Sequence, residues 1–122
     1  MISITVDKEE AIVTLEVEEP VRDQDIDTAV RIIDPFIEVR GTLTGVMVHA
    51  DTISTWKDFV AALERLKLVK NAHKKVKRVA FVTDTPPQQA EMRQVASRFG
   101  DAEVKHFPAD ARKEAKAWLL EA

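Results

Sequence analysis

Apolar and polar residues alternate at the start of the chain in the manner of a β-hairpin. Ile2, Ile4 and Val6 alternate with polar residues, which is the period of a half-buried strand. A polar segment follows at 7–10, and a second alternating run covers 11–17. Two short strands joined by a short polar loop predict an antiparallel hairpin.

Three further apolar runs predict the rest of a sheet. The runs at 43–49 and 76–82 are nearly continuous and rich in β-branched residues, which is typical of strands covered on both faces. The run at 102–107 alternates more and is expected nearer an edge. Helical patterns separate these runs, and strands that alternate with helices form parallel sheets. The sequence therefore predicts an α/β fold: a mixed sheet of four to five strands, with an N-terminal antiparallel hairpin, the remaining strands parallel, and four helices.

The first helical pattern contains a proline. Apolar residues at helical spacing run from Ile26 to Ile37, and Pro35 lies among them. Proline removes a backbone donor and clashes with the preceding turn. We therefore expect this helix to kink or to end near Asp34.

Capping residues at the expected helix termini, together with apolar stripes, predict three more helices. Thr55 and Asp58 resemble a capping box at the start of a helix that extends to residue 66. Thr85 is expected to cap a helix whose first residue is Pro86 and which ends at Gly100. The C-terminal helix is predicted from the stripe formed by Ala111, Ala115, Trp118 and Leu119.

Length and composition restrict the class of protein. A chain of 122 residues predicts a single domain over 1–122. The absence of cysteine excludes disulfides, thiolate metal sites and cysteine nucleophiles, and it fits a reducing compartment. No apolar run approaches the roughly 20 residues that span a bilayer, and the first residues lack the features of a signal peptide. We expect a cytoplasmic protein with no integral membrane segment.

Charge is balanced overall but uneven along the chain. The net charge of −3 argues against a nucleic-acid partner, because such proteins usually carry a strong basic excess. Seven Lys or Arg and no acidic residue lie between Arg65 and Arg78, whereas six acidic residues lie between Glu16 and Asp27. The basic stretch has no interleaved aromatic residues for base stacking. Opposite patches of this kind would pair between two copies, so a homodimer is a further expectation.

Several packing patterns along the chain occur together in one known family. They are the strand Gly45–His49, the helix opening Trp56–Phe59, a basic pair leading an apolar run at Lys77–Asp84, and the segments Val104–Phe107 and Glu114–Leu119. With its hairpin start, the chain resembles the SpoIIAA-like family, a branch of the STAS-like fold. The resemblance implies a non-enzymatic regulatory or interaction module with a protein partner, like anti-sigma-factor antagonists. Through the similar fold of CRAL-TRIO domains, it also implies an alternative, a carrier or sensor of a small apolar or lipid-like ligand.

The resemblance directs attention to the turn at 51–55. In anti-sigma-factor antagonists a kinase phosphorylates a serine in the matching strand-to-helix turn. Ser54 and Thr55 lie near an expected helix N-terminus, where a phosphate is electrostatically favoured. However, Trp56 and Lys57 stand where the family pattern has small residues. We expect Ser54 or Thr55 to cap the helix and the module to work without the usual phosphoserine switch.

Candidate chemistry gathers at the carboxyl ends of the expected parallel strands, where open α/β sheets bind ligands. His49, Asp51 and Asp84 fall there, and a histidine with two carboxylates suits acid–base catalysis or metal binding, so an enzyme is a second alternative. The simpler interpretation is turn and strand-end roles, because no catalytic or phosphate-binding motif is present. We therefore expect no catalytic residue, metal or cofactor.

Trp56 either packs in the core or anchors a partner. The candidate binding residues are His49, Asp51, Ser54, Thr55, Trp56 and Asp84.

Overall fold

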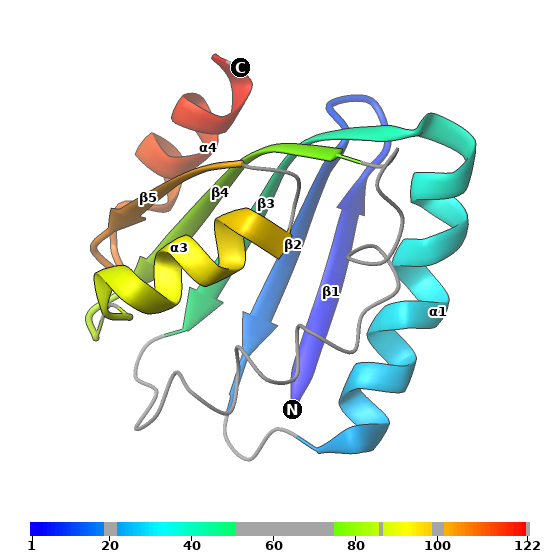
Figure 1. Cartoon of the computed structure of the whole chain (residues 1–122), viewed down its shortest axis with the longest axis horizontal. Coiled ribbons are helices and arrows are strands. Elements are labelled where there is room, and N and C mark those ends of the chain that lie inside the picture. The colour runs from blue at the N-terminus through cyan, green and yellow to red at the C-terminus, as the bar shows by residue number, and fades with distance from the viewer. Residues whose placement is uncertain (19–21, 51–74, 86, 99–101, 122) are drawn as a thin grey trace.

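The computed structural model describes most of the chain and contains one sheet. The described residues are 1–18, 22–50, 75–85, 87–98 and 102–121. Within them, five strands lie in the order β1-β2-β3-β4-β5, so that neighbours along the chain are also neighbours in the sheet (Figure 1).

The hairpin and the parallel strands are confirmed. β1 (Ile2–Asp7) pairs antiparallel with β2 (Ile12–Val17). β3 (Thr42–Ala50), β4 (Lys75–Thr83) and β5 (Glu103–Phe107) then follow in parallel register. The two nearly continuous apolar runs are the central strands β3 and β4, and the alternating run is the edge strand β5. Sequence periodicity thus predicts the pairing directions and the edge position of β5.

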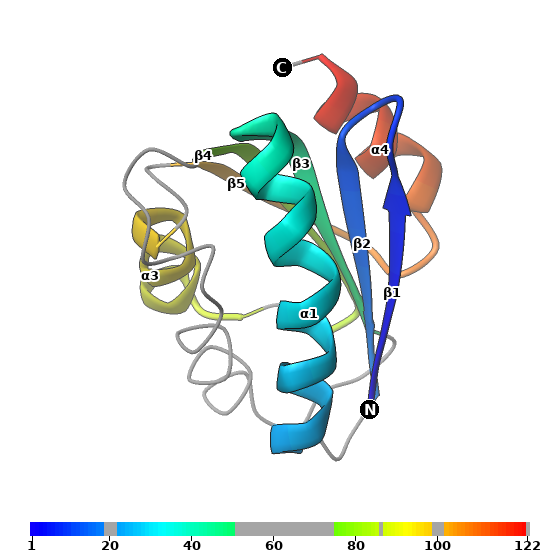
Figure 2. The same cartoon turned by 90° about the vertical axis from the view of Figure 1, so that its right-hand side faces the viewer.

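Three helices are described, and they cover the two faces unequally. α1 (Asp23–Arg40) and α3 (Gln89–Arg98) lie on one face, and α4 (Arg112–Leu120) lies on the other (Figure 2). The fourth helix predicted from the sequence, starting at Thr55, falls outside the described residues.

Pro35 does not end the first helix. α1 continues from Asp23 to Arg40 with Pro35 inside it, so of the two expected outcomes, a kink or an end near Asp34, the end is wrong. The pyrrolidine ring is exposed to solvent, and the turn beyond it carries Phe36, which packs against the core. Burial of the Phe36 ring offsets part of the roughly 3 kcal/mol that an internal proline costs.

The third predicted helix starts later than the capping residue Thr85 and the following Pro86 predict. α3 begins at Gln89 rather than at Pro86. Glu91 Oε1 accepts a hydrogen bond from the Gln88 N–H at 3.1 Å, so a side chain of the first turn satisfies the backbone donor just before the helix. Thr85 donates its N–H to Thr83 Oγ1 at 3.2 Å, so it belongs to the turn after β4.

Each face of the sheet has its own apolar core. The larger core packs α1 and α3 against side chains such as Val48 and Phe81. The smaller core packs Leu119 of α4 against Met47 of β3 and Val82 of β4. α4 also approaches β3 closely at Gly45, where a β-carbon would lie 2.6 Å from Leu119 Cδ2. At Gly45, where β3 has no side chain, Leu119 of α4 therefore packs directly against the strand backbone.

Candidate interaction groove

The structure describes only two of the six candidate site residues. His49 lies near the end of β3, half-buried, and is the register partner of Glu16 on β2. Asp84 follows β4 and is exposed. The other four, Asp51, Ser54, Thr55 and Trp56, lie outside the described residues, so a site that joins His49, Asp51 and Asp84 stays a prediction.

Asp84 organises the loop that leads into α4. Its Oδ1 accepts a hydrogen bond from the Ala109 N–H at 3.2 Å. The next turn is closed by the Ala111 N–H, which donates to the Pro108 carbonyl oxygen at 2.9 Å. Asp84 therefore helps to set where α4 begins.

His49 lies beside an ion pair between α4 and the sheet. Arg112 Nη2 donates to Glu16 Oε1. This hydrogen bond is the main reason that the pKa of Glu16 is lowered; partial burial acts in the opposite direction, and His49 adds a smaller lowering effect. A histidine, a carboxylate and a guanidinium from three elements thus meet at this end of the strands.

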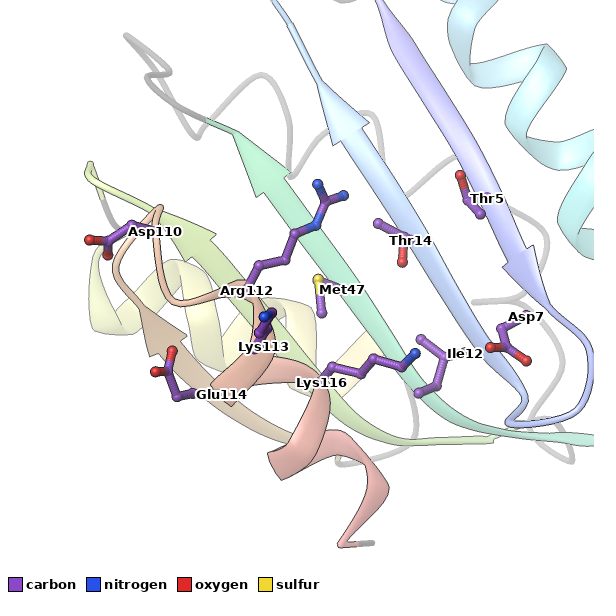
Figure 3. Close-up of a pocket in the computed structure, with 10 residues that line it drawn as sticks. All are labelled: Thr5, Asp7, Ile12, Thr14, Met47, Asp110, Arg112, Lys113, Glu114 and Lys116. Carbon is purple, nitrogen blue, oxygen red and sulfur yellow. The ribbon is translucent and has the colours of Figure 1, made fainter.

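Arg112 of this pair also lines an open groove between α4 and the sheet. The groove has a volume of about 720 Å³ and is shown in Figure 3. Ile12 and Met47 line its floor and are each only 3% exposed, whereas Thr5 and Thr14 contribute hydroxyl groups. The remaining lining residues are charged: Asp7, Asp110, Arg112, Lys113, Glu114 and Lys116.

Ion pairs fix charges on both sides of the groove. Lys116 Nζ lies 3.2 Å from Glu10 Oε1, at the opposite end of β2 from the Arg112–Glu16 pair. Asp7 accepts the Glu10 N–H at 3.0 Å, which is the main cause of its lowered pKa, and Lys116 lowers it further. The first turns of α4 are therefore tied to the hairpin, and positive and negative groups alternate around an apolar floor.

No sequence motif marks these groove residues. Arg112 and Lys116 are four residues apart and share one helix face, which was the available signal. Their partners on β2 are distant in sequence, so the pairs follow only from the fold. Glu16, the first residue of the acidic stretch, pairs with Arg112 of α4.

Two further properties follow for the described part of the chain. No group of three or more histidine, aspartate or glutamate side chains there is suited to hold a metal ion. None of the described helices is long and apolar enough to cross a membrane.

The order of elements, with an antiparallel hairpin followed by parallel strands and helices on both faces, defines an α/β domain of the STAS-like class. A family model described as SpoIIAA-like matches residues 12–120, and the chain belongs to this family. The resemblance inferred from the sequence is thereby confirmed. No curated protein and no solved structure matches the chain significantly.

The Arg112–Glu16 pair makes a testable prediction about titration. Arg112→Ala should raise the pKa of Glu16 toward its ordinary value, because the largest cause of the lowering is removed. A carboxyl whose pKa is lowered in the folded state stabilises the fold at neutral pH, and this contribution is lost as the pH falls through the folded-state pKa. Both side chains are nearly half exposed, at 47% and 46%, so the effect on stability is small. NMR titration of the carboxyl groups is therefore the measurement.

Asp7 provides the internal control for that titration. Its pKa is lowered mainly by the Glu10 N–H, which Arg112 does not contact. The Asp7 titration should therefore stay unchanged in Arg112→Ala. A Glu16 pKa that also stays unchanged would contradict the assigned ion pair.

Proposed function

We propose that this SpoIIAA-like domain is a non-enzymatic interaction module that binds a protein partner along the groove between α4 and the hairpin. The observation that carries the proposal is the mixture of fixed charges around a buried apolar floor. Three acidic and three basic side chains line the groove. A protein surface can match such a mixed pattern, whereas nucleic acid requires a continuous positive field.

The proposed partner surface extends from the groove to the carboxyl ends of the strands. His49, the register partner of Glu16, comes two residues before the segment 51–56 in the sequence, which is the expected partner-binding segment. Trp56 would supply an aromatic anchor there, since aromatic residues contribute strongly to interfaces. We include in this proposal a regulatory role without a phosphoserine switch, because Trp56 and Lys57 replace the small residues of the switch pattern.

Charge reversal at Lys113 tests the proposal. Lys113 is exposed and lines the groove, so Lys113→Glu should weaken partner binding by about tenfold or more without unfolding the protein. Lys77→Glu is the matched control, because Lys77 is also exposed and does not line the groove. Affinity capture with the three proteins as baits, followed by calorimetry on the purified pair, measures the effect.

The expected result is a partner protein that is captured by the wild-type and Lys77→Glu baits but not by the Lys113→Glu bait. The proposal fails if no captured protein is lost with the Lys113→Glu bait. It also fails if a captured partner, once purified, binds Lys113→Glu and Lys77→Glu with equal affinity.

The alternative function, a carrier of a small apolar ligand, has a separate location. An apolar groove of about 530 Å³ lies between β1 and α1 and includes Val6 and Phe36 in its lining. Native mass spectrometry of the purified protein tests this alternative directly, since a bound lipid-like molecule adds its mass.

A further inference from the structure

The two edges of the sheet differ in how well they resist pairing with another strand. Charged residues on an edge strand discourage edge-to-edge association. β5 is short and carries Glu103 and Lys105. β1 has no charged residue in its first five positions, from Ile2 to Val6. The β1 edge therefore lacks the protection that the β5 edge has.

The edge of β1 continues into exposed apolar surface on α1. Ile32 is 42% exposed and Val39 is 87% exposed, and both line the groove beside Val6. They are seven residues apart and so share one face of the helix. Figure 2 shows α1 running alongside β1, with the β1 edge toward the viewer. Edge strand and helix together present one apolar strip.

We propose that β1 pairs with β1 of a second copy, antiparallel about a two-fold axis at Ile4. Such an interface uses the same patch on both copies. In this register Ile4 faces Ile4 of the second copy, and Ile2 faces Val6. Residues directly opposite in an antiparallel pair lie on the same face of the sheet, so apolar side chains meet on the face that carries α1. The two sheets become one continuous sheet of ten strands.

Charges at the two ends of the strip complement each other in this arrangement. Asp25, at the start of α1, lies 3.3 Å from the Met1 amino group, next to the beginning of β1. Lys8 follows the end of β1 and lines the groove with Val39. An antiparallel pairing brings the acidic start of α1, Asp25 and Asp27, toward Lys8 of the second copy. This complementarity favours a second copy over an unrelated strand.

The two α1 helices complete the interface. A two-fold axis perpendicular to the sheet places both helices on the same face, side by side and antiparallel. Ile32, midway along α1 between Asp25 and Val39, then approaches Ile32 of the second copy, whereas Val39, which lines the groove with Lys8, approaches the start of the second α1. The interface does not involve the groove under α4, so it stands or falls separately from the proposed function.

The oligomeric state tests the proposal first. Light scattering coupled to size-exclusion chromatography should give twice the chain mass of 13.7 kDa. Val39→Glu should raise the dissociation constant by about tenfold or more, because it places a charge in the strip. Leu120→Glu is the matched control: Leu120 is 44% exposed but lies on α4, and its substitution should leave the dimer intact.

The charge arrangement has its own test. Lys8→Glu and Asp27→Lys should each weaken the dimer, and the double variant should regain much of the wild-type affinity. Additive weakening in the double variant would overturn the proposed orientation.

The register is tested with a single cysteine, since the natural chain has none. Opposed Cα atoms in an antiparallel pair lie about 4.5 to 5.5 Å apart, within the range of a disulfide. Ile4→Cys should therefore cross-link two copies on mild oxidation, whereas Leu120→Cys should not.

Three outcomes would overturn the proposal. The first is a monomer at all concentrations from about 1 to 100 μM. The second is a dimer that neither Val39→Glu nor oxidation of Ile4→Cys affects. The third is a monomer that carries a lipid-like mass lost in Val39→Glu, which would assign the strip to an apolar ligand.

Discussion

Replacing Gly45 with alanine is expected to destabilise the protein by about 1 to 3 kcal/mol, the usual cost of overpacking a well-packed core. The added β-carbon would lie 2.6 Å from Leu119 Cδ2 and 3.2 Å from the Arg78 carbonyl oxygen. Leu119 is fully buried and cannot turn into solvent, so α4 must shift away from β3. Urea unfolding followed by circular dichroism measures the loss.

A double-mutant cycle identifies the contact responsible. Leu119→Ala alone should cost about 2 to 5 kcal/mol, because it leaves a cavity under α4. The methyl group that Gly45→Ala introduces would partly fill that cavity, so the double variant should be more stable than the sum of the single effects predicts, by about 1 kcal/mol. Strict additivity would show that the clash at Gly45 is relieved in another way.

Arg78→Met is expected to destabilise the protein by about 1.5 to 3 kcal/mol, the range for hydrogen bonds to charged groups. Arg78 Nη1 donates to the Trp118 carbonyl oxygen at 2.6 Å, and the guanidinium carbon lies 4.8 Å from the centroid of the Trp118 ring. The last turn of α4 has no basic residue of its own. Arg78 on β4 therefore supplies the positive charge that a helix C-terminus favours.

Neighbouring variants separate this role from a general effect of charge. Lys77→Met changes the adjacent, exposed residue of β4 and should alter stability by less than about 0.5 kcal/mol. Arg78→Lys should fall between wild type and Arg78→Met, since an ammonium group keeps the charge but not the planar fork. Equal losses for Lys77→Met and Arg78→Met in urea unfolding would refute the assignment.

Local patterns predict the strands of this protein well and the helix ends less well. Alternation in Ile2–Val6 and the continuous runs of β3 and β4 indicate which faces of each strand are buried, and this pattern predicts the antiparallel hairpin and the parallel strands. The ends near Pro35 and Pro86 depend on competing local preferences. At Pro35 the helix continues despite the local penalty, and the tertiary packing of Phe36, which offsets part of that penalty, is not visible in any local pattern.

The groove under α4 depends on contacts that the sequence does not display. Glu16 and Arg112 are 96 positions apart, and Arg78 and Trp118 are 40 apart. Only the path of the chain brings them together. Of the predicted site residues, the structure pairs His49 with Glu16 and uses Asp84 in a turn.

The strand order also bears on where a ligand can approach. In doubly wound sheets the order reverses at one point, and helices diverging to opposite faces open a crevice at the strand tips. Here the order advances from β1 to β5 without reversal, and the described crossover helices stay on one side. Within the part of the chain that the structure describes, the winding therefore opens no crevice of that kind. What it leaves open instead is the flank of the sheet under α4, which a single helix covers only in part and where the groove lies.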